Sequence, residues 1–493
     1  MPDLEPDGST VDVGTLQLRT PGISGRAEVV PPAQQGTRLG GLDAAALDAA
    51  LERQGVATRH LVEVDVTDNA NRPAPPGIDV RRRSANEPVM ELEVPFEGDN
   101  VAQVVLSIDE QGLVTWNLPV ESPGAAGVTR GGSARLFQIR SYSPRPDPEP
   151  GMRGVVGFLG KKMLRVLAFP IVEAGVSLIA DDVAGWWEER NRPYRARTFA
   201  PDSYTRDDGP LVEGDQWRTF SKGPALLILH GTFSRAHTGF DGIPPADLAT
   251  LHQRYGGRVF AFDHFTLAHD PVKNVEELVS RLPADATLEL DILSHSRGGL
   301  VGRVLAERQS ELSLGARSIK IRRHVFAAGP NAGTVLADTT YLGDLVDSYT
   351  NMLQYLPSNG VTETLEAIVL TVKHIAAGAV KGLPGLQAML PGGPLYQKLN
   401  GDSAIDTRYF ALAANYEPTQ AGFREWAQDR LRDAIFKCDN DLVVPTAGVY
   451  DENGNPLFAI DQRKVFNLRD GVWHSGFFQN RDAMRQVLEW LPG

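Results

Sequence analysis

Six short apolar runs recur along the second half of the chain, and their alternation with helical stretches constrains the fold more than any other feature. They lie at 225–229, 258–262, 288–293, 324–328, 408–413 and 464–467. Runs of this kind are typical of strands buried on both faces of a parallel sheet. We therefore expect a doubly wound α/β domain over residues 222–493, in which ligands bind beyond the carboxyl ends of the strands.

The composition is that of a globular protein and excludes several other classes. Lys and Arg total 49 and Asp and Glu total 62, so the formal net charge is −13, which argues against nucleic acid as a partner. A single cysteine, Cys438, leaves no internal disulfide, Cys-rich zinc site or two-cysteine redox motif. We expect no metal and no cofactor, and the cysteine usage permits a reducing compartment.

Neither targeting nor membrane insertion is predicted. The first seven residues are acidic, whereas a secretory signal begins with positive charge followed by an apolar core. The two most apolar stretches, 155–180 and 365–380, are interrupted by charged side chains, so neither predicts a membrane span. We expect a cytoplasmic protein without a transmembrane segment.

The first half of the chain predicts a separate, β-rich unit. Residues 1–40 are rich in Pro, Gly and polar residues and predict a flexible arm. Asp43 is expected to cap a short helix over 44–54 that ends at Gly55. Strands are expected at 60–66, 90–95, 101–108 and 113–120, the last two joined by a hairpin turn. These elements predict an accessory domain over 41–145.

A proline-rich stretch follows this unit and predicts a domain boundary. Four prolines over 141–151 favour a stiff, extended linker. Beyond it, the apolar spacing over 155–189 predicts a helix kinked at Pro170, packed on the body of the protein. Residues 146–221 are therefore expected to form a linker and a helical connector.

The most informative motif is the segment 290–305, an apolar strand, a turn of small residues and an apolar helix. This order predicts a nucleophile elbow with Ser296 exposed above the sheet. Positions two before and two after the serine must be small, because strand and helix approach closely there. Ser294 and Gly298 meet that need, although the more common first residue is glycine. An ordinary strand-to-helix turn is the alternative reading.

Attack on a carbonyl needs N–H donors for the oxyanion, and two are expected. The backbone N–H of Arg297 lies at the start of the predicted helix, where the helix dipole favours negative charge. The second is expected from the loop after 225–229, where we nominate the N–H of Thr232. Gly231 allows a close backbone approach, and His230 is expected to organise this loop rather than transfer protons.

A nucleophilic serine also needs a base, and His474 is the candidate among ten histidines. It follows the last apolar run and precedes a terminal helix, which matches a late histidine in the order Ser, acid, His. His295, beside the serine, is expected to have a supporting role. Structural roles are expected for His60, His237, His252, His264, His269, His324 and His374.

The orienting carboxylate is expected in the loop after the run at 408–413. Asp441 is our choice, because the buried Val443 and Val444 behind it would hold its carboxylate toward the imidazole. Asp439 is the alternative. Cys438 lies on the same loop without an elbow and is taken as incidental.

With Ser296, Asp441 and His474 in this order, residues 222–493 resemble the α/β-hydrolase superfamily. The similarity is greatest to bacterial lipase- and esterase-like hydrolase domains, some of which are fused to CHAT domains. It is carried by the segments 230–234, 262–267, 294–303, 327–334 and 385–389. The resemblance implies acyl-ester chemistry on a mostly parallel, doubly wound sheet, with a small-molecule acyl ester or lipid as substrate.

Residues 335–405 are too long for a simple connection and predict an inserted helical cap or lid. An apolar stripe over 365–376 is expected to pack in the core or to line an acyl pocket, and an apolar cap could also meet a lipid surface.

Two other functions stay open at this point. One is a binding or signalling module with little turnover, in which the first half of the chain would bind an unknown protein partner. The other is a thioesterase, amidase or acyltransferase that uses the same three residues.

Overall fold

A seven-stranded sheet forms the core of the second half of the protein in a computed structural model. The structure describes residues 1–31, 42–69, 89–110, 112–120, 134–140, 160–173, 176–177, 183–356, 360–399, 406–451 and 458–493. The sheet has the order β12-β14-β13-β15-β16-β17-β18, in which only the edge strand β12 is antiparallel to its neighbour. The strands are β12 (Arg195–Thr198), β13 (Ala225–Leu229), β14 (Val259–Asp263), β15 (Thr287–His295), β16 (Ser318–Ala327), β17 (Arg408–Ala414) and β18 (Ile460–Phe466). Each of the six predicted apolar runs overlaps one of the strands β13–β18, which confirms them.

Helices cover both faces of this sheet, because alternate side chains of its strands point to opposite faces. On one face, α5 (Pro245–Arg254) and α13 (Arg481–Trp490) pack on Leu226, Ile228 and Leu293. On the other, α6 (Pro271–Arg281) and α7 (Gly298–Glu307) pack on Leu227, Leu229 and Ile292. Shorter helices are α3 (Gln216–Phe220), α4 (Ala236–Gly239) and α12 (Ala421–Trp426), the last continued by a π-helix over Ala427–Phe436. The domain is therefore a three-layer α/β structure.

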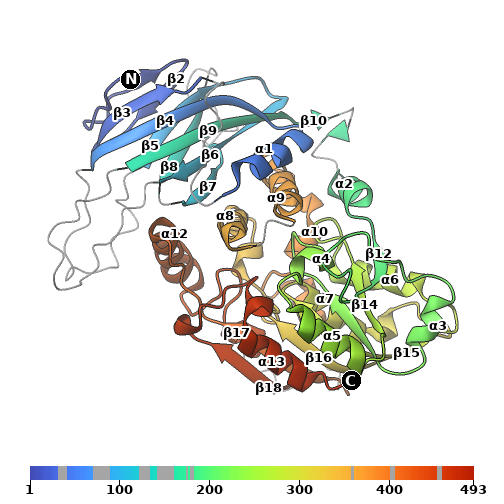
Figure 1. The fold of residues 1–493 in the computed structure, drawn as a ribbon. Helices are drawn as coiled ribbons and strands as arrows, with labels where there is room; N and C mark the ends of the chain where they lie inside the picture. The colour runs from blue at the N-terminus through green and yellow to red at the C-terminus, as the bar shows by residue number, and fades with distance from the viewer. Residues whose placement is uncertain are drawn as a thin grey trace.

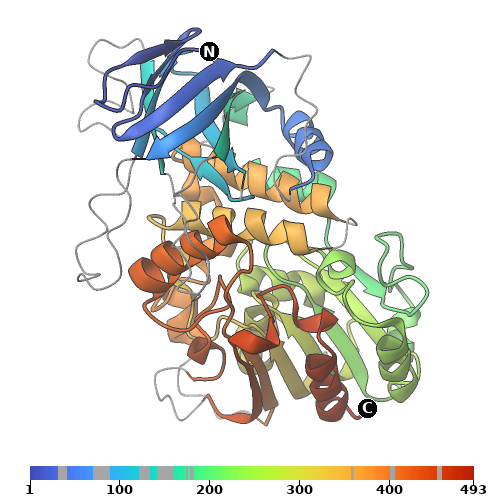
Figure 2. The same cartoon turned by 60° about the vertical axis from the view of Figure 1, so that its left-hand side comes forward.

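Four α-helices lie among the described residues between β16 and β17. They are α8 (Leu342–Met352), α9 (Val361–Ala376), α10 (Pro384–Gln387) and α11 (Pro394–Leu399). We call them the inserted helices. Both α8 and α9 lie between the seven-stranded sheet and the strands of the first half (Figures 1 and 2). The apolar residues of α9 join the main hydrophobic cluster, so the predicted stripe packs in the core.

The first half of the chain forms two antiparallel sheets that pack on each other. One has the order β3-β4-β9-β6-β7 and the other the order β1-β2-β5-β8. The strands are β1 (Val11–Val13), β2 (Leu16–Arg19), β3 (Ile23–Val29), β4 (Ala57–Asn69), β5 (Val89–Pro95), β6 (Val101–Asp109), β7 (Val114–Asn117), β8 (Ala134–Arg140) and β9 (Gly160–Pro170). Leu16, Leu18 and Leu92 meet Val64 and Leu164 in the cluster between the sheets. A two-stranded hairpin, β10 (Val172–Glu173) and β11 (Val176–Ser177), follows.

Two predictions for this half are wrong. Residues 1–40 do not form a flexible arm in their described part, because β1, β2 and β3 bury alternate apolar side chains within the two sheets. In the described residues of 155–189 the predicted helix is replaced by β9, a strand with a partner on each side, and α2 (Val183–Asn191) is the helical segment among them. A short apolar run fits a strand or a helix, and the two partner strands decide between them. The linker over 141–151 lies outside the described residues.

The predicted helix after Asp43 is confirmed as α1 (Ala44–Arg53). The Asp43 carboxylate accepts from the N–H groups of Ala45 and Ala46 at 3.0 and 3.1 Å, and Gly55 follows the helix with φ +64°. Helix α1 packs against α9, and Arg53 forms an ion pair with Glu366 at 2.6 Å. The first half of the chain is thus bound to the inserted helices rather than tethered by a linker alone.

Candidate active site

Ser296 lies at the tight turn between β15 and α7, where the sequence places it. Its φ is +51°, a left-handed conformation that is strained for a residue with a side chain. The Ser296 N–H donates to the carbonyl of Ala327 on the neighbouring strand at 2.8 Å, which fixes the turn. This conformation sets the serine above the carboxyl end of the sheet, as a nucleophile elbow requires.

The two small residues that flank the serine, Ser294 and Gly298, have different roles in the structure. A Cβ on Gly298 would lie 2.4 Å from the carbonyl oxygen of Leu229, so only glycine lets α7 start this close to β13. The Ser294 hydroxyl hydrogen bonds to Nε2 of His324 at 2.8 Å, and it lies 3.3 Å from the carbonyl of Val325. Serine replaces the more common glycine here because its hydroxyl has a buried partner, and His324 has the structural role that was predicted.

We expect Gly298→Ala to destabilise the protein by on the order of 3 kcal/mol, because the new methyl group overlaps a backbone carbonyl that cannot move away cheaply. Gly343→Ala in α8 is the matched control, since a Cβ there meets no atom within 4 Å. That variant is expected to be neutral or slightly more stable. Urea denaturation of both variants measures the difference, and equal stability would contradict the close approach at the elbow.

Ser296, His474 and Asp441 are joined in one chain of hydrogen bonds. Nε2 of His474 lies 2.9 Å from Oγ of Ser296, and Nδ1 lies 2.9 Å from Oδ2 of Asp441. All three side chains are buried, with 0% of His474 exposed and 1% of each of the others. The hydrogen bond to the carboxylate requires a proton on Nδ1, which leaves the lone pair of Nε2 facing the serine hydroxyl.

The loop that carries Asp441 holds its carboxylate in place. The other oxygen, Oδ1, accepts from the backbone N–H groups of Val443 at 3.0 Å and Val444 at 2.8 Å. Leu442 turns the chain with φ +86°, and the backbone carbonyl of Asp441 accepts from the N–H of His474 at 3.2 Å. The alternative acid, Asp439, is mostly exposed and pairs with Arg432 at 2.6 Å. The structure therefore brings Asp441 and not Asp439 to the histidine.

Both nominated oxyanion donors are available. Within the part of the chain that the structure describes, the backbone N–H groups of Thr232 and Arg297 donate to no protein acceptor. The Arg297 side chain points away and is fully buried, and its Nε donates to the carbonyl of Gly385 at 2.8 Å. Burial lowers the pKa of Arg297 to about 10, and Glu188 is the first of the groups that oppose this shift. Arg297 thus ties the elbow to the inserted helices through its side chain.

The residues beside the elbow have supporting contacts. A Cβ on Gly231 would lie 2.8 Å from Cβ of Ser296 and 2.9 Å from Nδ1 of His295, so the loop needs glycine there. Nε2 of His295 hydrogen bonds to the carbonyl of His474 at 2.8 Å, and burial lowers the pKa of His295 to about 3. His295 is therefore neutral and helps to hold the backbone of His474.

His230 organises its loop, as the sequence predicted, through bonds at both ring nitrogens. Its Nε2 accepts from the N–H of His264 at 3.0 Å, so Nδ1 carries the proton and donates to the carbonyl of Gly231 at 3.0 Å. Burial lowers the pKa of His230 to about 3, which keeps the ring neutral. Both nitrogens are thus engaged away from Ser296.

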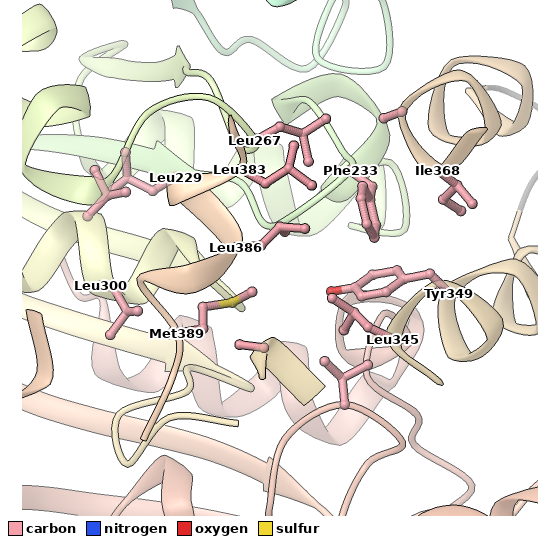
Figure 3. Packing of buried hydrophobic residues seen from close by; sticks show 14 of the residues in the cluster. Leu229, Phe233, Leu267, Leu300, Leu345, Tyr349, Ile368, Leu383, Leu386 and Met389 are labelled. Carbon is pink, nitrogen blue, oxygen red and sulfur yellow. The ribbon is translucent and has the colours of Figure 1, made fainter. Parts of the chain in front are cut away.

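Sequence reasoning missed Tyr349 of α8. Its hydroxyl lies 3.3 Å from Nε2 of His474, and its ring meets Phe233 edge-on at 4.9 Å between centroids. Figure 3 shows Tyr349 lying next to Phe233, with Met389 on the other side of its hydroxyl. Tyr349 comes from the inserted helices, whose packing on the elbow has no local sequence signal.

Two cavities lie beside this group of residues. One encloses about 540 Å³, including its open mouth, with Thr232, His295 and Ser475 on its polar wall and Met352 and Leu356 on its apolar wall. The other, of about 210 Å³, is mostly apolar and is lined by Leu300, Met389, Leu390, Leu395 and Leu399, among others. Sδ of Met389 lies 3.8 Å from Oγ1 of Thr232. The second cavity thus begins close to the nominated oxyanion donor.

Two other kinds of site are absent from the described residues. No group of three or more His, Cys, Asp or Glu side chains among them is arranged to hold a metal ion. None of the helices found there has the length and apolar character needed to cross a membrane.

Comparison with known proteins gives one family and a set of distant structures. A family model described as a domain of unknown function, DUF7379, matches residues 191–492. No protein among those with curated functions matches the sequence.

The similar solved structures are hydrolases of low sequence identity. A mature lipase from Bacillus licheniformis is 16% identical, with 54% of this chain and 91% of that chain covered and a TM-score of 0.30. Lipase 1 from Pelosinus fermentans is 14% identical, with 55% and 96% covered and a TM-score of 0.37. A 2-hydroxy-6-oxo-6-phenylhexa-2,4-dienoate hydrolase from Rhodococcus is 15% identical, with 55% and 92% covered and a TM-score of 0.32.

Proposed function

We propose that this chain, which belongs to the DUF7379 family of domains of unknown function, hydrolyses carboxylic esters through Ser296. The fold is that of an α/β-hydrolase, with the elbow after a central strand of a mostly parallel sheet and Ser, Asp and His in chain order. The observation that carries the proposal is the buried chain from Ser296 through His474 to Asp441, with both hydrogen bonds at 2.9 Å.

In this proposal His474 takes the proton of Ser296 as Oγ attacks the ester carbonyl carbon. Asp441 keeps the proton of His474 on Nδ1 and stabilises the imidazolium that forms. The N–H groups of Thr232 and Arg297 stabilise the oxyanion, with help from the N-terminus of α7. The C–O bond to the alcohol then breaks, and the alcohol leaves with the proton from Nε2. A water deprotonated by His474 attacks the acyl-enzyme, which releases the acid and restores Ser296.

The inserted helices would act as a cap over this site. The serine and histidine are buried, so an ester reaches them only when part of residues 335–405 moves. The apolar cavity behind Met389 would hold the acyl group once the inserted helices move apart and widen it. The alcohol would then leave through the larger cavity that opens to solvent. The two sheets of the first half would form an accessory unit that supports the cap.

Covalent labelling with a fluorophosphonate probe tests the proposal. We expect one probe per chain, bound to Ser296 when the modified residue is located by mass spectrometry, because only an activated serine attacks such a probe. Ser475→Ala, which removes a hydroxyl from the same cavity wall, should still be labelled. Absence of labelling in the folded protein, and also in Met352→Ala, which widens the cavity beside the site, would contradict an activated serine and favour a binding module.

A further inference from the structure

We propose that the hydroxyl of Tyr349 is a third oxyanion donor, a role that rests on the proposed function and adds a catalytic residue from the inserted helices. The hydroxyl lies 3.3 Å from Nε2 of His474, the atom that also faces Oγ of Ser296. The side chains of Ser296 and Thr232 lie close enough to it to lower the pKa of Tyr349, against the larger effect of burial. The hydroxyl therefore lies among the nucleophile, the base and the loop that carries the nominated N–H donor.

The environment of Tyr349 keeps its hydroxyl protonated and pointed at the site. Only 5% of the residue is exposed, and burial raises the pKa of Tyr349 well above its ordinary value. Its ring rests edge-on against Phe233, the residue after Thr232, with centroids 4.9 Å apart (Figure 3). A neutral phenol can donate one hydrogen bond at any pH at which a serine hydrolase works.

The order of proton transfers explains when the Tyr349 hydroxyl can donate to the oxyanion. Nε2 of His474 has a single lone pair, and it accepts from one hydroxyl at a time, either Ser296 or Tyr349. When Ser296 attacks, its proton moves to Nε2 and occupies that lone pair. The Tyr349 O–H then has no acceptor on the histidine, while negative charge develops on the carbonyl oxygen beside Thr232. The hydroxyl can then donate to the oxyanion instead, so it stabilises the transition state more than the ground state.

The first half of the chain holds the helix that presents Tyr349. The side-chain carbonyl of Asn351 accepts from the N–H of Val114 at 2.8 Å, and its amide donates to the carbonyl of Val114 at 2.6 Å. Oδ1 of Asp347 accepts from the N–H of Trp116 at 2.8 Å. In this way α8 side chains take the place of a further strand beside β7, which lies at the edge of its sheet.

Helical geometry then sets Tyr349 on the opposite side of α8. Asp347 and Asn351 are four residues apart and share one face, whereas Tyr349 lies about 200° around the helix from each, at about 100° per residue. The face that binds β7 and the face that meets His474 therefore belong to the same two turns. The sheet fixes the rotation of α8 and with it the position of the Tyr349 hydroxyl.

Kinetics of Tyr349→Phe test the donor directly, since this variant removes one oxygen and keeps the ring. We expect kcat to fall by about 10- to 100-fold with KM nearly unchanged, and the rate of fluorophosphonate labelling to fall in parallel. The loss should be equal for esters with good and poor leaving groups, because the oxyanion forms in both. Tyr341→Phe, at the start of the same helix, is the control and should keep full activity.

A double-mutant cycle with Asn351→Ala tests whether the hydrogen bonds between Asn351 and Val114 position α8 and Tyr349. We expect this variant to lower kcat in the native background and to have little further effect in the Tyr349→Phe background, because it acts by displacing the tyrosine hydroxyl.

Unchanged kcat in Tyr349→Phe, with wild-type labelling at Ser296, would overturn the inference and leave the proposed function standing. A loss seen only with poor leaving groups would also overturn it, because it would assign Tyr349 to the departing alcohol. Failure of the wild-type protein to be labelled would overturn both.

Discussion

Ser296→Ala is expected to abolish ester hydrolysis, with kcat lower by on the order of 10⁴- to 10⁶-fold. The variant lacks the hydroxyl that lies 2.9 Å from Nε2 of His474, and the other hydroxyl of the elbow, that of Ser294, hydrogen bonds to His324 instead. Steady-state assays with a chromogenic short-chain ester measure the loss. Residual turnover would come from water attack assisted by the oxyanion donors and the intact histidine.

The fold should survive this change. Alanine meets the same left-handed φ of +51° that serine meets, and the bond from the N–H to Ala327 is kept. We expect a thermal midpoint within a few degrees of the wild-type value. Ser294→Ala is the matched control, since it removes a buried hydroxyl two residues away and the bond to His324. It should cost about 1 kcal/mol of stability and keep activity. Unaltered hydrolysis in Ser296→Ala would reject the assignment of the nucleophile.

Asp441→Asn is expected to lower kcat by on the order of 10²- to 10⁴-fold while leaving the structure intact. Oδ1 accepts from two backbone N–H groups, so the carbonyl oxygen of the asparagine would take that position. Its NH₂ group would then face Nδ1 of His474. An N–H donor there forces the histidine to carry its proton on Nε2, where it can no longer accept the proton of Ser296. The loss would follow from the wrong tautomer rather than from a missing charge alone.

Asp439→Asn is the matched control for this prediction. It lies two residues away on the same loop and pairs with Arg432 at the surface, so kcat should change less than about twofold. Measurement of kcat and KM for both variants separates the two carboxylates. A large loss in Asp439→Asn with an active Asp441→Asn would reverse the assignment of the acid.

The parts of the site that follow the chain locally were predictable from the sequence. The elbow, the loop after β13 and the loop of Asp441 each join a buried strand to a turn, and a parallel sheet brings the carboxyl ends of its strands to one edge. Six apolar runs were sufficient to place those strands. Ser296, His474 and Asp441 therefore meet in the structure where their positions after these strands place them.

The features that depend on packing between distant segments were not predictable. The run at 160–170 forms the middle strand β9 because β4 and β6 pair with it on its two sides, which its own spacing does not show. β12 was missed because its sequence, Arg-Ala-Arg-Thr, has no apolar run. Arg197 is buried there, where it pairs with Asp263 at 3.1 Å and donates to the carbonyl of Arg206 at 2.9 Å. Tyr349 lies beside His474 because of how α8 packs between β7 and the site, and no sequence motif marks this residue.

The contact between α8 and β7 also bears on how this protein behaves when its helices are removed. Asn351 and Asp347 engage backbone groups of Val114 and Trp116 that a neighbouring strand would otherwise occupy. Deleting residues 335–405 to open the site would leave those groups unsatisfied on an exposed strand edge, a ready template for pairing between molecules. A protein truncated in this way should self-associate, so loss of activity in it would report aggregation rather than the absence of a lid.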